Sequence, residues 1–240
     1  MTDSEPVVTS LHLGKARDIT AADTGEWWDK PWRTGFYKAP AEGELWLGYE
    51  GFRGDEQADR RYHGGPEKAV CVYPAEHYPH WRRALSLPDL DSGAFGENLT
   101  VTGLIETAVS IGDVFTLGGA RVQISQPRQP CWKLARRWRV KDLAVQVERT
   151  GFTGYYFRVL RHGPVRAGDG LTLEDRPFPG WTIQRCNEIM HHQTSDREAA
   201  EALAGCPLLS SSWKDSLWAR AQRPVAVDES SRQARTSQPL

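Results

Sequence analysis

The stretch of the chain best suited to chemistry surrounds Cys131. This thiol follows a predicted strand and the two prolines Pro127 and Pro130, so we expect it on a stiff loop. Nearby cations favour the thiolate, the form of cysteine that attacks electrophiles and binds metals. The pattern fits a reactive thiol as well as a structural cysteine beside a solvated basic face. The 28 residues from 114 to 141 lack Asp and Glu and carry seven positive charges, at Arg121, Arg128, Lys133, Arg136, Arg137, Arg139 and Lys141.

The other three cysteines suit packing better than chemistry. Cys71 lies in an apolar predicted strand, Cys186 on a helix with core spacing, and Cys206 near a helix end. No two cysteines form a C-x-x-C pair, so we expect no structural zinc site. Four cysteines in 240 residues do not suggest a disulfide scaffold either. We therefore expect four reduced thiols in a cytoplasmic protein.

A second candidate is the polar loop that contains His63-Gly64-Gly65-Pro66. It places an imidazole next to bare backbone, just before a predicted strand. Glycines let a ligand approach the backbone and offer N–H groups to an anion, but from the sequence alone a turn that needs positive φ is the better explanation of them. Neighbouring cations are Arg60, Arg61 and Lys68. A divalent cation and simple solvation are the alternatives for the carboxylates that precede His63, at Asp55, Glu56 and Asp59.

A third candidate is Asn98, in the segment Phe95-Gly-Glu-Asn-Leu. Its side-chain amide can donate and accept hydrogen bonds at the edge of a heterocycle, and the same residue is also typical of a turn. The sequence contains no P-loop, no dinucleotide-binding glycine motif, no H-E-x-x-H and no G-x-S-x-G. These absences exclude the commonest nucleotide-binding, zinc-protease and serine-hydrolase classes.

The composition is that of an ordinary globular protein. Of the 240 residues, 39% are hydrophobic and 25% charged, and 30 Lys and Arg against 31 Asp and Glu leave a net charge of -1. This balance argues against a strongly basic nucleic-acid-binding protein and against a wholly disordered chain. No segment approaches the roughly 18 consecutive apolar residues of a membrane-spanning helix, and residues 1–10 lack the pattern of a signal peptide.

These functional stretches must be positioned by a strand-rich middle of the chain. Gly118-Gly119 between two alternating runs predicts a hairpin. We expect a closed, turn-rich β structure. The predicted strands cover residues 11–19, 44–49, 68–73, the two arms of the hairpin within 109–125, 155–161 and 170–174.

Helices are predicted beside the strands and at the end of the chain. They cover residues 74–85, 131–139, a segment from the capping residue Asp142 to Gly151, 181–204, and 208–221 with Ser210, Ser211 or Ser212 as cap. We divide the chain into an N-terminal segment at 1–29 that begins with a frayed end over 1–10, a mainly β domain at 30–178, a small helical region at 179–222 and a disordered tail at 223–240.

Taken together, six motifs resemble the MOSC domain family in its YiiM-type branch. They appear in the family's order and cover roughly residues 30 to 175, and the helical region after them resembles the three-helix region of this branch. The resemblance implies a mostly β, barrel-like domain with helical insertions. The six motifs are Gly54 to Asp59, His63 to Pro66, Cys71 to Tyr78, Phe95 to Leu99, Ile111 to Phe115, and Gln126 to Leu134.

The resemblance also implies a cofactor and a reaction. The family is associated with the molybdenum cofactor, a molybdenum ion held by a pterin dithiolene, and the YiiM-type branch with reduction of N-hydroxylated compounds such as 6-hydroxylaminopurine. In redox-active members the motif cysteine supplies a thiolate to the metal, and this residue corresponds to Cys131, which becomes the expected catalytic residue and metal ligand. The expected cofactor-binding residues are His63, Gly64, Gly65, Lys68, Asn98, Arg128 and Lys133, the last two being the cations nearest to the cysteine in sequence.

Two other functions remain open at this stage. Cys131 can carry sulfur as a persulfide without redox turnover, or the basic run can bind an anion or nucleic acid, with affinity that falls steeply with salt. For the reductase, the expected partners are a small N-hydroxylated substrate and a separate electron-donating reductase, because the chain has no flavin or nicotinamide motif. We expect no membrane, no specific nucleic acid and no pyridoxal phosphate, and a homodimer is compatible with the sequence.

Overall fold

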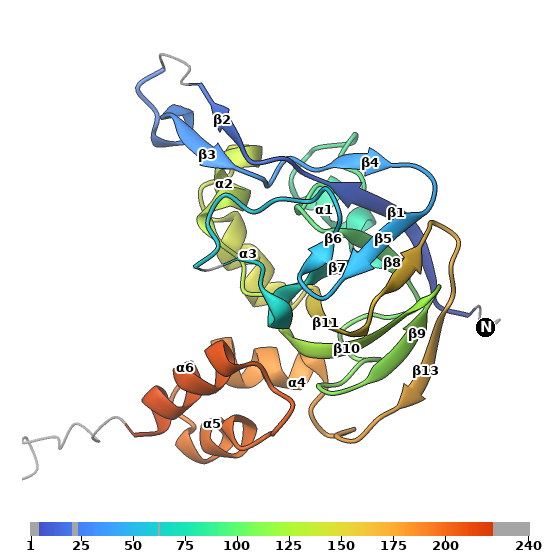
Figure 1. Cartoon of the computed structure of the whole chain (residues 1–240). Coiled ribbons are helices and arrows are strands. Elements are labelled where there is room, and N and C mark those ends of the chain that lie inside the picture. The colour runs from blue at the N-terminus through green and yellow to red at the C-terminus, as the bar shows by residue number, and fades with distance from the viewer. Residues whose placement is uncertain (1–4, 21–23, 62, 223–240) are drawn as a thin grey trace, which may run out of the picture.

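The computed structural model describes residues 5–20, 24–61 and 63–222, which fold around one eight-stranded sheet (Figure 1). The strand order is β13-β9-β10-β11-β7-β8-β1-β4, and every pair is antiparallel except β7 and β8. The predicted tail at 223–240 lies outside the described residues. The strands are β1 (Val7–Leu13), β4 (Ala39–Ala41), β7 (Val70–Pro74), β8 (Leu99–Thr102), β9 (Val114–Leu117), β10 (Ala120–Pro127), β11 (Tyr155–Arg161) and β13 (Leu171–Asp175).

Two smaller sheets flank the large one. One has the order β12-β5-β6, and the other pairs β2 with β3 in an extension that projects from the body of the molecule (Figure 1). Their strands are β2 (Arg17–Ile19), β3 (Trp32–Thr34), β5 (Leu45–Gly48), β6 (Gly51–Phe52) and β12 (Gly163–Val165).

The expected closed, barrel-like sheet is wrong in one respect, because the large sheet curls without closing. β4 pairs with the C-terminal half of one edge of β1. The remaining part of that edge meets the segment that leads into β13, because Val7 bridges Gly170 and Val8 forms backbone hydrogen bonds with Gly168 and Asp169. This contact ends at Leu171, from which β13 pairs with β9. In the described part of the chain the large sheet therefore does not close into a continuous barrel.

The predicted frayed end at residues 1–10 is also wrong where the structure describes it. β1 begins at Val7 and pairs through Val7 and Val8 with Thr102 and Val101 of β8, and Val8 is fully buried. The predicted strand over residues 11–19 is broken at Gly14. A Cβ there would lie 2.4 Å from the carbonyl oxygen of Gly35, so the chain needs a glycine at this close approach.

Most other predicted strands are confirmed. The hairpin forms as β9 and β10 with Gly118-Gly119 at its turn, and β11 spans residues 155–161 as expected. All five residues of β7 are buried, as its apolar composition indicates.

The helices agree with expectation except near residue 190. The expected helix over 181–204 is instead three pieces, because Asp196 begins a new helix by accepting a hydrogen bond from the backbone N of Ala199 at 2.9 Å. Gly151 ends the helix that follows Asp142, with φ +73°, and Ser210 caps the last helix. The elements are η1 (Trp27–Asp29), η2 (Pro66–Lys68), η3 (Ala75–His77), α1 (Tyr78–Ala84), α2 (Trp132–Trp138), α3 (Leu143–Thr150), α4 (Ile183–Asn187), the π-helical η4 (Glu188–His192), α5 (Arg197–Ala204) and α6 (Ser211–Ala221).

The C-terminal helices share a core with the large sheet. Ile183 of α4 and Trp213 of α6 belong to the same buried apolar cluster as Phe115 and Ile124 of the sheet. A second cluster lies under α1, α2 and α3 around Trp81. No helix in the described part of the chain is long and apolar enough to cross a membrane.

Replacing Trp213 tests this shared core. Trp213→Ala is expected to lower the free energy of unfolding by about 3–5 kcal/mol, because a fully buried indole leaves a large cavity. Chemical denaturation measures this change. Trp218→Ala is the control on the same helix, since Trp218 is 37% exposed, and should lower stability clearly less than Trp213→Ala does. Equal small losses in both variants would contradict a shared core.

Candidate functional site

One cleft brings most of the predicted site residues together. It lies where the loop after β6 meets β7, the end of β10 and the start of α2. Cys131 lines it together with six of the seven predicted cofactor-binding residues, and Gly65 is the exception. Those six are His63, Gly64, Lys68, Asn98, Arg128 and Lys133.

Cys131 is placed at the junction between a strand and a helix. β10 ends at Pro127, and Cys131 is the extended residue before α2, with φ -128° and ψ 166°. Its carbonyl oxygen accepts the first helical hydrogen bond, from Leu134 N at 3.1 Å. It is partly exposed, whereas the other three cysteines are buried. The thiol expected to react therefore faces open space.

Arg128 supplies a buried cation to this cleft. Its guanidinium donates to the carbonyl oxygen of Phe95 at 2.5 Å, and its backbone N donates to Gly154 O at 3.0 Å. Only 5% of the residue is exposed, and among the described residues Nη1 has no hydrogen-bond partner. A buried unpaired donor is costly, so this nitrogen is suited to an anion that enters the cleft.

His63 lines the same cleft as a neutral imidazole. Burial lowers its pKa to about 4, and three cations add to this shift: Lys133, Arg128 and Lys68. Burial also lowers the pKa values of Lys68 and Lys133. The cleft thus combines an uncharged histidine at neutral pH with four cationic residues, of which Lys38 is paired with Asp55.

The two glycines after His63 have a conformational role. Their φ values are +78° at Gly64 and +82° at Gly65, a region that other residues rarely adopt. A Cβ on Gly64 would lie 2.7 Å from Oε1 of Gln57, whereas one on Gly65 would meet nothing within 4 Å. The turn therefore accounts for both glycines, and only Gly64 reaches the cleft.

Asn98 lines the cleft with its hydrogen-bond donors already engaged. Its Nδ2 donates to the carbonyl of His12 at 3.2 Å and to Oδ2 of Asp55 at 3.0 Å, and its Oδ1 accepts from Cys71 N at 3.2 Å. Asn98 thus joins β1, β7 and the loop after β6. Both hydrogen bonds donated by Nδ2 go to protein acceptors, so this group is not available to bind a cofactor as expected.

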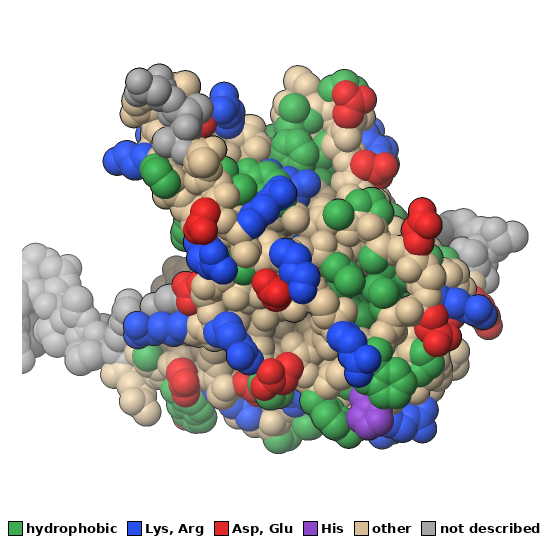
Figure 2. Space-filling view, turned by 45° about the horizontal axis from the view of Figure 1, so that its top comes forward, with side chains coloured by type: hydrophobic (Ala, Val, Ile, Leu, Met, Phe, Trp, Pro, Cys, Tyr) green, Lys and Arg blue, Asp and Glu red, His purple; other side chains and the backbone are tan. Residues whose placement is uncertain are grey.

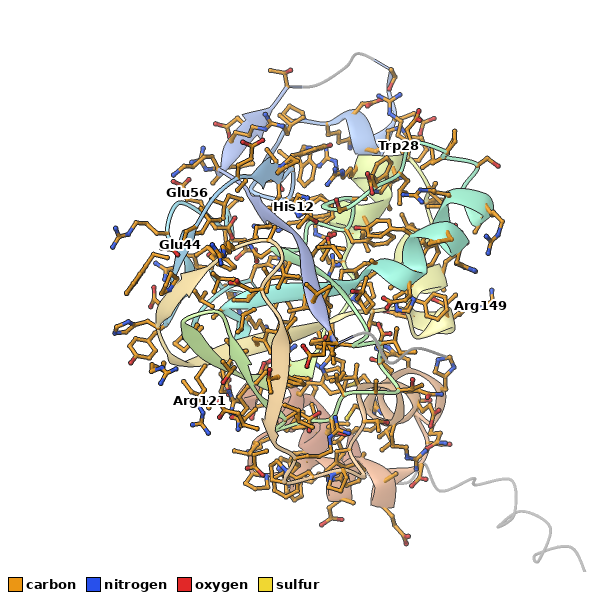
Figure 3. All side chains as sticks on the ribbon, turned by 90° about the vertical axis from the view of Figure 1, so that its right-hand side faces the viewer. His12, Trp28, Glu44, Glu56, Arg121 and Arg149 are labelled. Carbon is orange, nitrogen blue, oxygen red and sulfur yellow. The ribbon has the colours of Figure 1, made fainter. Side chains whose placement is uncertain are left out.

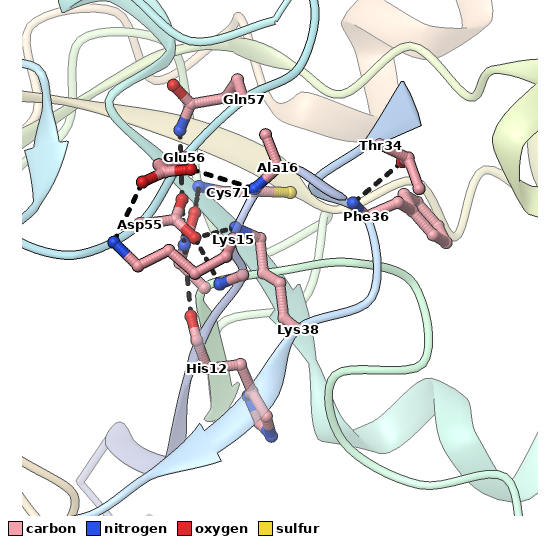
Figure 4. A network of polar contacts seen from close by, with 12 residues as sticks. His12, Lys15, Ala16, Thr34, Phe36, Lys38, Asp55, Glu56, Gln57 and Cys71 are labelled. Atoms are coloured by element: carbon pink, nitrogen blue, oxygen red, sulfur yellow. Dashed lines mark hydrogen bonds and ion pairs between the residues drawn. The ribbon is translucent and has the colours of Figure 1, made fainter. Parts of the chain in front are cut away.

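Asp55 lies at the centre of the same network (Figure 4). Its carboxylate forms a buried ion pair with Lys38 and accepts from Gly14 N at 2.7 Å and Gln57 Nε2 at 3.1 Å. Glu56 is paired with Lys15 at 3.0 Å. These carboxylates are neutralised by protein groups, and the described residues contain no cluster of metal-binding side chains. The alternative of a divalent cation in this loop has no support.

The basic run from 114 to 141 does not form one surface. Only Arg128 and Lys133 of its seven cations line the cleft. Arg121 projects at the edge of the molecule, paired with Glu174 at 2.5 Å (Figure 3). Arg139 pairs with Asp29 at 2.8 Å, and Arg137 donates to the carbonyl of Gly93 at 2.8 Å. On the face in Figure 2, Lys and Arg side chains are interspersed with Asp and Glu. This distribution does not favour nucleic-acid binding.

Sequence reasoning missed several residues that line the cleft, among them Lys38, Gln57 and Tyr156. It also assigned Cys71 to packing. Cys71 is buried but lines the cleft, opposite Tyr156 in the pairing of β7 with β11. Burial raises the pKa of both groups. The alternation of buried and partly buried residues along β11 is the sequence signal that could have singled out Tyr156. The alternation alone does not locate the cleft, because the pairing of β11 with β7 decides what that face of the strand meets.

This fold and this cleft define a class of domain. An open, mostly antiparallel sheet carries a cysteine at a strand-to-helix junction, inside a cationic cleft, and a helical region follows. The MOSC domain model matches residues 59–172, and the YiiM-like three-helix domain model matches residues 181–220. The chain belongs to the MOSC domain family, in its YiiM-like branch. MOSC domains are associated in general with the molybdenum cofactor.

Relatives and solved structures agree with this assignment. YflK of Bacillus subtilis, described as uncharacterized, is 48% identical over 92% of this chain and 97% of its own length. Protein YiiM of Escherichia coli is 39% identical over 73% of this chain and 79% of its own. The crystal structure of YiiM from Geobacillus stearothermophilus superimposes with a TM-score of 0.75 at 33% identity, covering 90% of this chain and 99% of the other.

A protein of Gibberella moniliformis described as a reductase is 38% identical over 64% of this chain. The match spans 28% of that longer protein, so its activity as a whole does not transfer directly.

Thiol labelling tests the placement of Cys131. In the folded protein, iodoacetamide is expected to modify Cys131 first, at least about tenfold faster than Cys71, Cys186 or Cys206, because the other three are buried. Peptide mass spectrometry measures the order. All four should react alike in denaturant, and early labelling of Cys186 or Cys206 in the folded protein would contradict the structure.

Acid stability tests the environment of His63. Below pH 6.5 the unfolded chain binds a proton at His63 while the folded protein does not, so stability should fall as pH drops from 6.5 toward 4. His63→Gln is expected to reduce this slope, and His191 and His12 also contribute to it, because burial lowers the pKa of His191 to about 4 and lowers that of His12. Chemical denaturation at several pH values measures the slope. An NMR titration of His63 centred at pH 6.5 would contradict the burial.

Proposed function

We propose that this protein is a molybdenum-cofactor-dependent reductase of N-hydroxylated compounds, with Cys131 as the molybdenum ligand. The observation that carries the proposal is the position of the one partly exposed cysteine in a cleft lined by four cationic residues, of which only Lys38 is paired with a cleft carboxylate, that of Asp55. The reductase among the relatives adds support for redox chemistry. We also propose a cytoplasmic location, where four free thiols stay reduced.

The residues of the cleft fit an anionic pterin cofactor. Its phosphate carries negative charge, and the unpaired Nη1 of Arg128 is a buried donor without a protein partner among the described residues. Lys68 and Lys133 add positive charge at the same cleft. Neutral His63 can donate or accept a hydrogen bond there. Arg128, Lys133, Lys68 and His63 would therefore hold the cofactor, and Cys131 would bind its metal.

The proposed reaction converts an N-hydroxyl group to an amine and water, with two electrons and two protons consumed. When bound, the molybdenum centre supplies two-electron oxygen removal, and a separate reductase would supply the electrons. Tyr156 lines the cleft, and burial raises the pKa of its hydroxyl, so at neutral pH this group keeps its proton and can act as a hydrogen-bond donor.

An aromatic pair beside Cys131 favours a planar substrate such as an N-hydroxylated purine base. Trp132 is 49% exposed and lies between the lining residues Cys131 and Lys133. Its ring lies against Trp32, with centroids 5.1 Å apart, and the Arg136 guanidinium lies 5.5 Å from its centroid. The indole thus contacts Trp32 and Arg136 while about half of Trp132 stays exposed next to two lining residues, and this exposed part is suited to stack a heterocycle.

Metal content tests the cofactor assignment. Protein produced in a host that makes the cofactor is expected to contain molybdenum, and Cys131→Ala should lose most of it because the thiolate ligand is absent. Elemental mass spectrometry measures the metal. Cys206→Ala is the control, since Cys206 is buried outside the cleft. Wild-type protein without molybdenum, or equal content in Cys131→Ala, would refute the assignment.

Turnover separates a reductase from a sulfur carrier. With a chemical electron donor, the loaded protein should convert 6-hydroxylaminopurine to adenine, and Cys131→Ala should lose at least about 100-fold in rate. A persulfide carrier would show no conversion and would release sulfide on reduction of Cys131.

The aromatic pair is tested by changing the ring. Trp132→Ala is expected to raise KM for 6-hydroxylaminopurine about 10- to 100-fold, because stacking contributes about 1–3 kcal/mol per base, while KM for the non-aromatic N-hydroxyurea changes little. Steady-state kinetics measure both. Trp46→Ala is the control, since Trp46 is 43% exposed and lies in β5 instead of next to Cys131. Equal changes for the two substrates would argue against stacking.

A further inference from the structure

The C-terminal helix α6 is linked to the cleft by hydrogen bonds to the carboxylate of Glu67. Glu67 lies in η2, directly before the lining residue Lys68. Its carboxylate accepts hydrogen bonds from the backbone N of Ser211, at 3.0 and 3.2 Å, and from the Ser211 hydroxyl. Arg158 of β11 adds an ion pair at 3.3 Å. A helix N-terminus has unsatisfied N–H groups and partial positive charge, so α6 is suited to hold this carboxylate.

The same turn of α6 also holds the end of β10. Ser210 N donates to the carbonyl of Ser125 at 2.9 Å, and the Ser212 hydroxyl donates to Oε1 of Gln126 at 3.2 Å. Ser125 continues the chain of contacts, because its buried hydroxyl donates to the carbonyl of Glu67 at 2.6 Å. The start of α6 therefore contacts two walls of the cleft, the η2 wall and the strand that leads to Arg128.

The η2 wall needs such support because its own structure is weak. It consists of a three-residue 3-10 helix after the two glycines at 64 and 65, and such short helices have poor hydrogen-bond geometry. Glycines lose more conformational freedom on folding than other residues. Within this turn, Lys68 N donates to Gly65 O at 3.0 Å. The contacts from Ser125 and Ser211 anchor it from outside.

We propose that the C-terminal helical region sets the geometry of the cleft, and that Glu67 and Ser211 are positioning residues for Lys68 and for the turn that follows His63. The inference rests on the proposed function only in assigning an anionic ligand to the cleft. Residues of α6 do not line the cleft themselves, so the effect passes through η2 and β10.

Hydrogen exchange of the cofactor-free protein tests the proposal. In Glu67→Gln, amide exchange over residues 64–69 is expected to rise about tenfold, as for loss of one charge-assisted hydrogen bond. Ser211→Ala should show a smaller rise because it keeps the backbone donor, and Ser211→Thr should restore wild-type exchange. Calorimetric titration should show affinity for inorganic phosphate weakened at least about fivefold in Glu67→Gln.

Asp196 provides the matched control. It caps α5 in the same helical region and accepts a hydrogen bond from Ala199 N, and among the described residues its side chain forms no hydrogen bond or ion pair with η2. Asp196→Ala should lower Tm and leave exchange over residues 64–69 unchanged. The proposal is overturned if Asp196→Ala loosens that segment as much as Glu67→Gln does, or if exchange and phosphate affinity in Glu67→Gln match the wild type. If α6 unfolds in Glu67→Gln, the Ser211 variants decide. Molybdenum content plays no part in these readouts, so failure of the proposed function is distinguishable.

Discussion

The structure around the cleft depends on the buried ion pair between Asp55 and Lys38. Their side chains are only 2% and 7% exposed, so each charge requires a partner in place of water. Asp55 also accepts hydrogen bonds from Gly14, Gln57 and Asn98, which brings together the end of β1, the loop after β6 and the segment before β8. Lys38, Gln57 and Asn98 all line the cleft, so its floor is tied to this one carboxylate.

Positively charged side chains surround the Cys131 thiol in this cleft. Lys68 belongs to η2, Arg128 directly follows β10, and Lys133 lies in the first turn of α2 after Cys131. β10 pairs with β11 and β11 with β7, and this order of strands sets the two walls opposite each other. Because the cations are partly desolvated, an anion gains more from them than it would from exposed lysines. The other basic residues of the same stretch serve ion pairs and carbonyls elsewhere.

Local features of this structure follow from short stretches of sequence. Gly118-Gly119 turns the hairpin, Gly151 ends α3, and the apolar residues of β7 form a buried strand, because each depends on conformational preferences within a few residues. The failures are non-local. The sequence predicts a frayed end at Val7, but pairing with Thr102 makes this residue part of β1. The sheet stays open because β4 takes half of the β1 edge and only a short contact with residues 168–171 fills the rest.

By itself, the sequence determined the motif set, the elements of the strand-rich middle and the thiol at Cys131, because residue type and spacing act locally. Only the tertiary structure decided what each candidate does. It directed the amide of Asn98 to protein partners, left Nη1 of Arg128 unpaired among the described residues, and turned Cys71 and Tyr156 into the cleft. Burial, hydrogen-bond partners and distances between charges depend on strand pairings between residues far apart in the chain, and no local pattern encodes them.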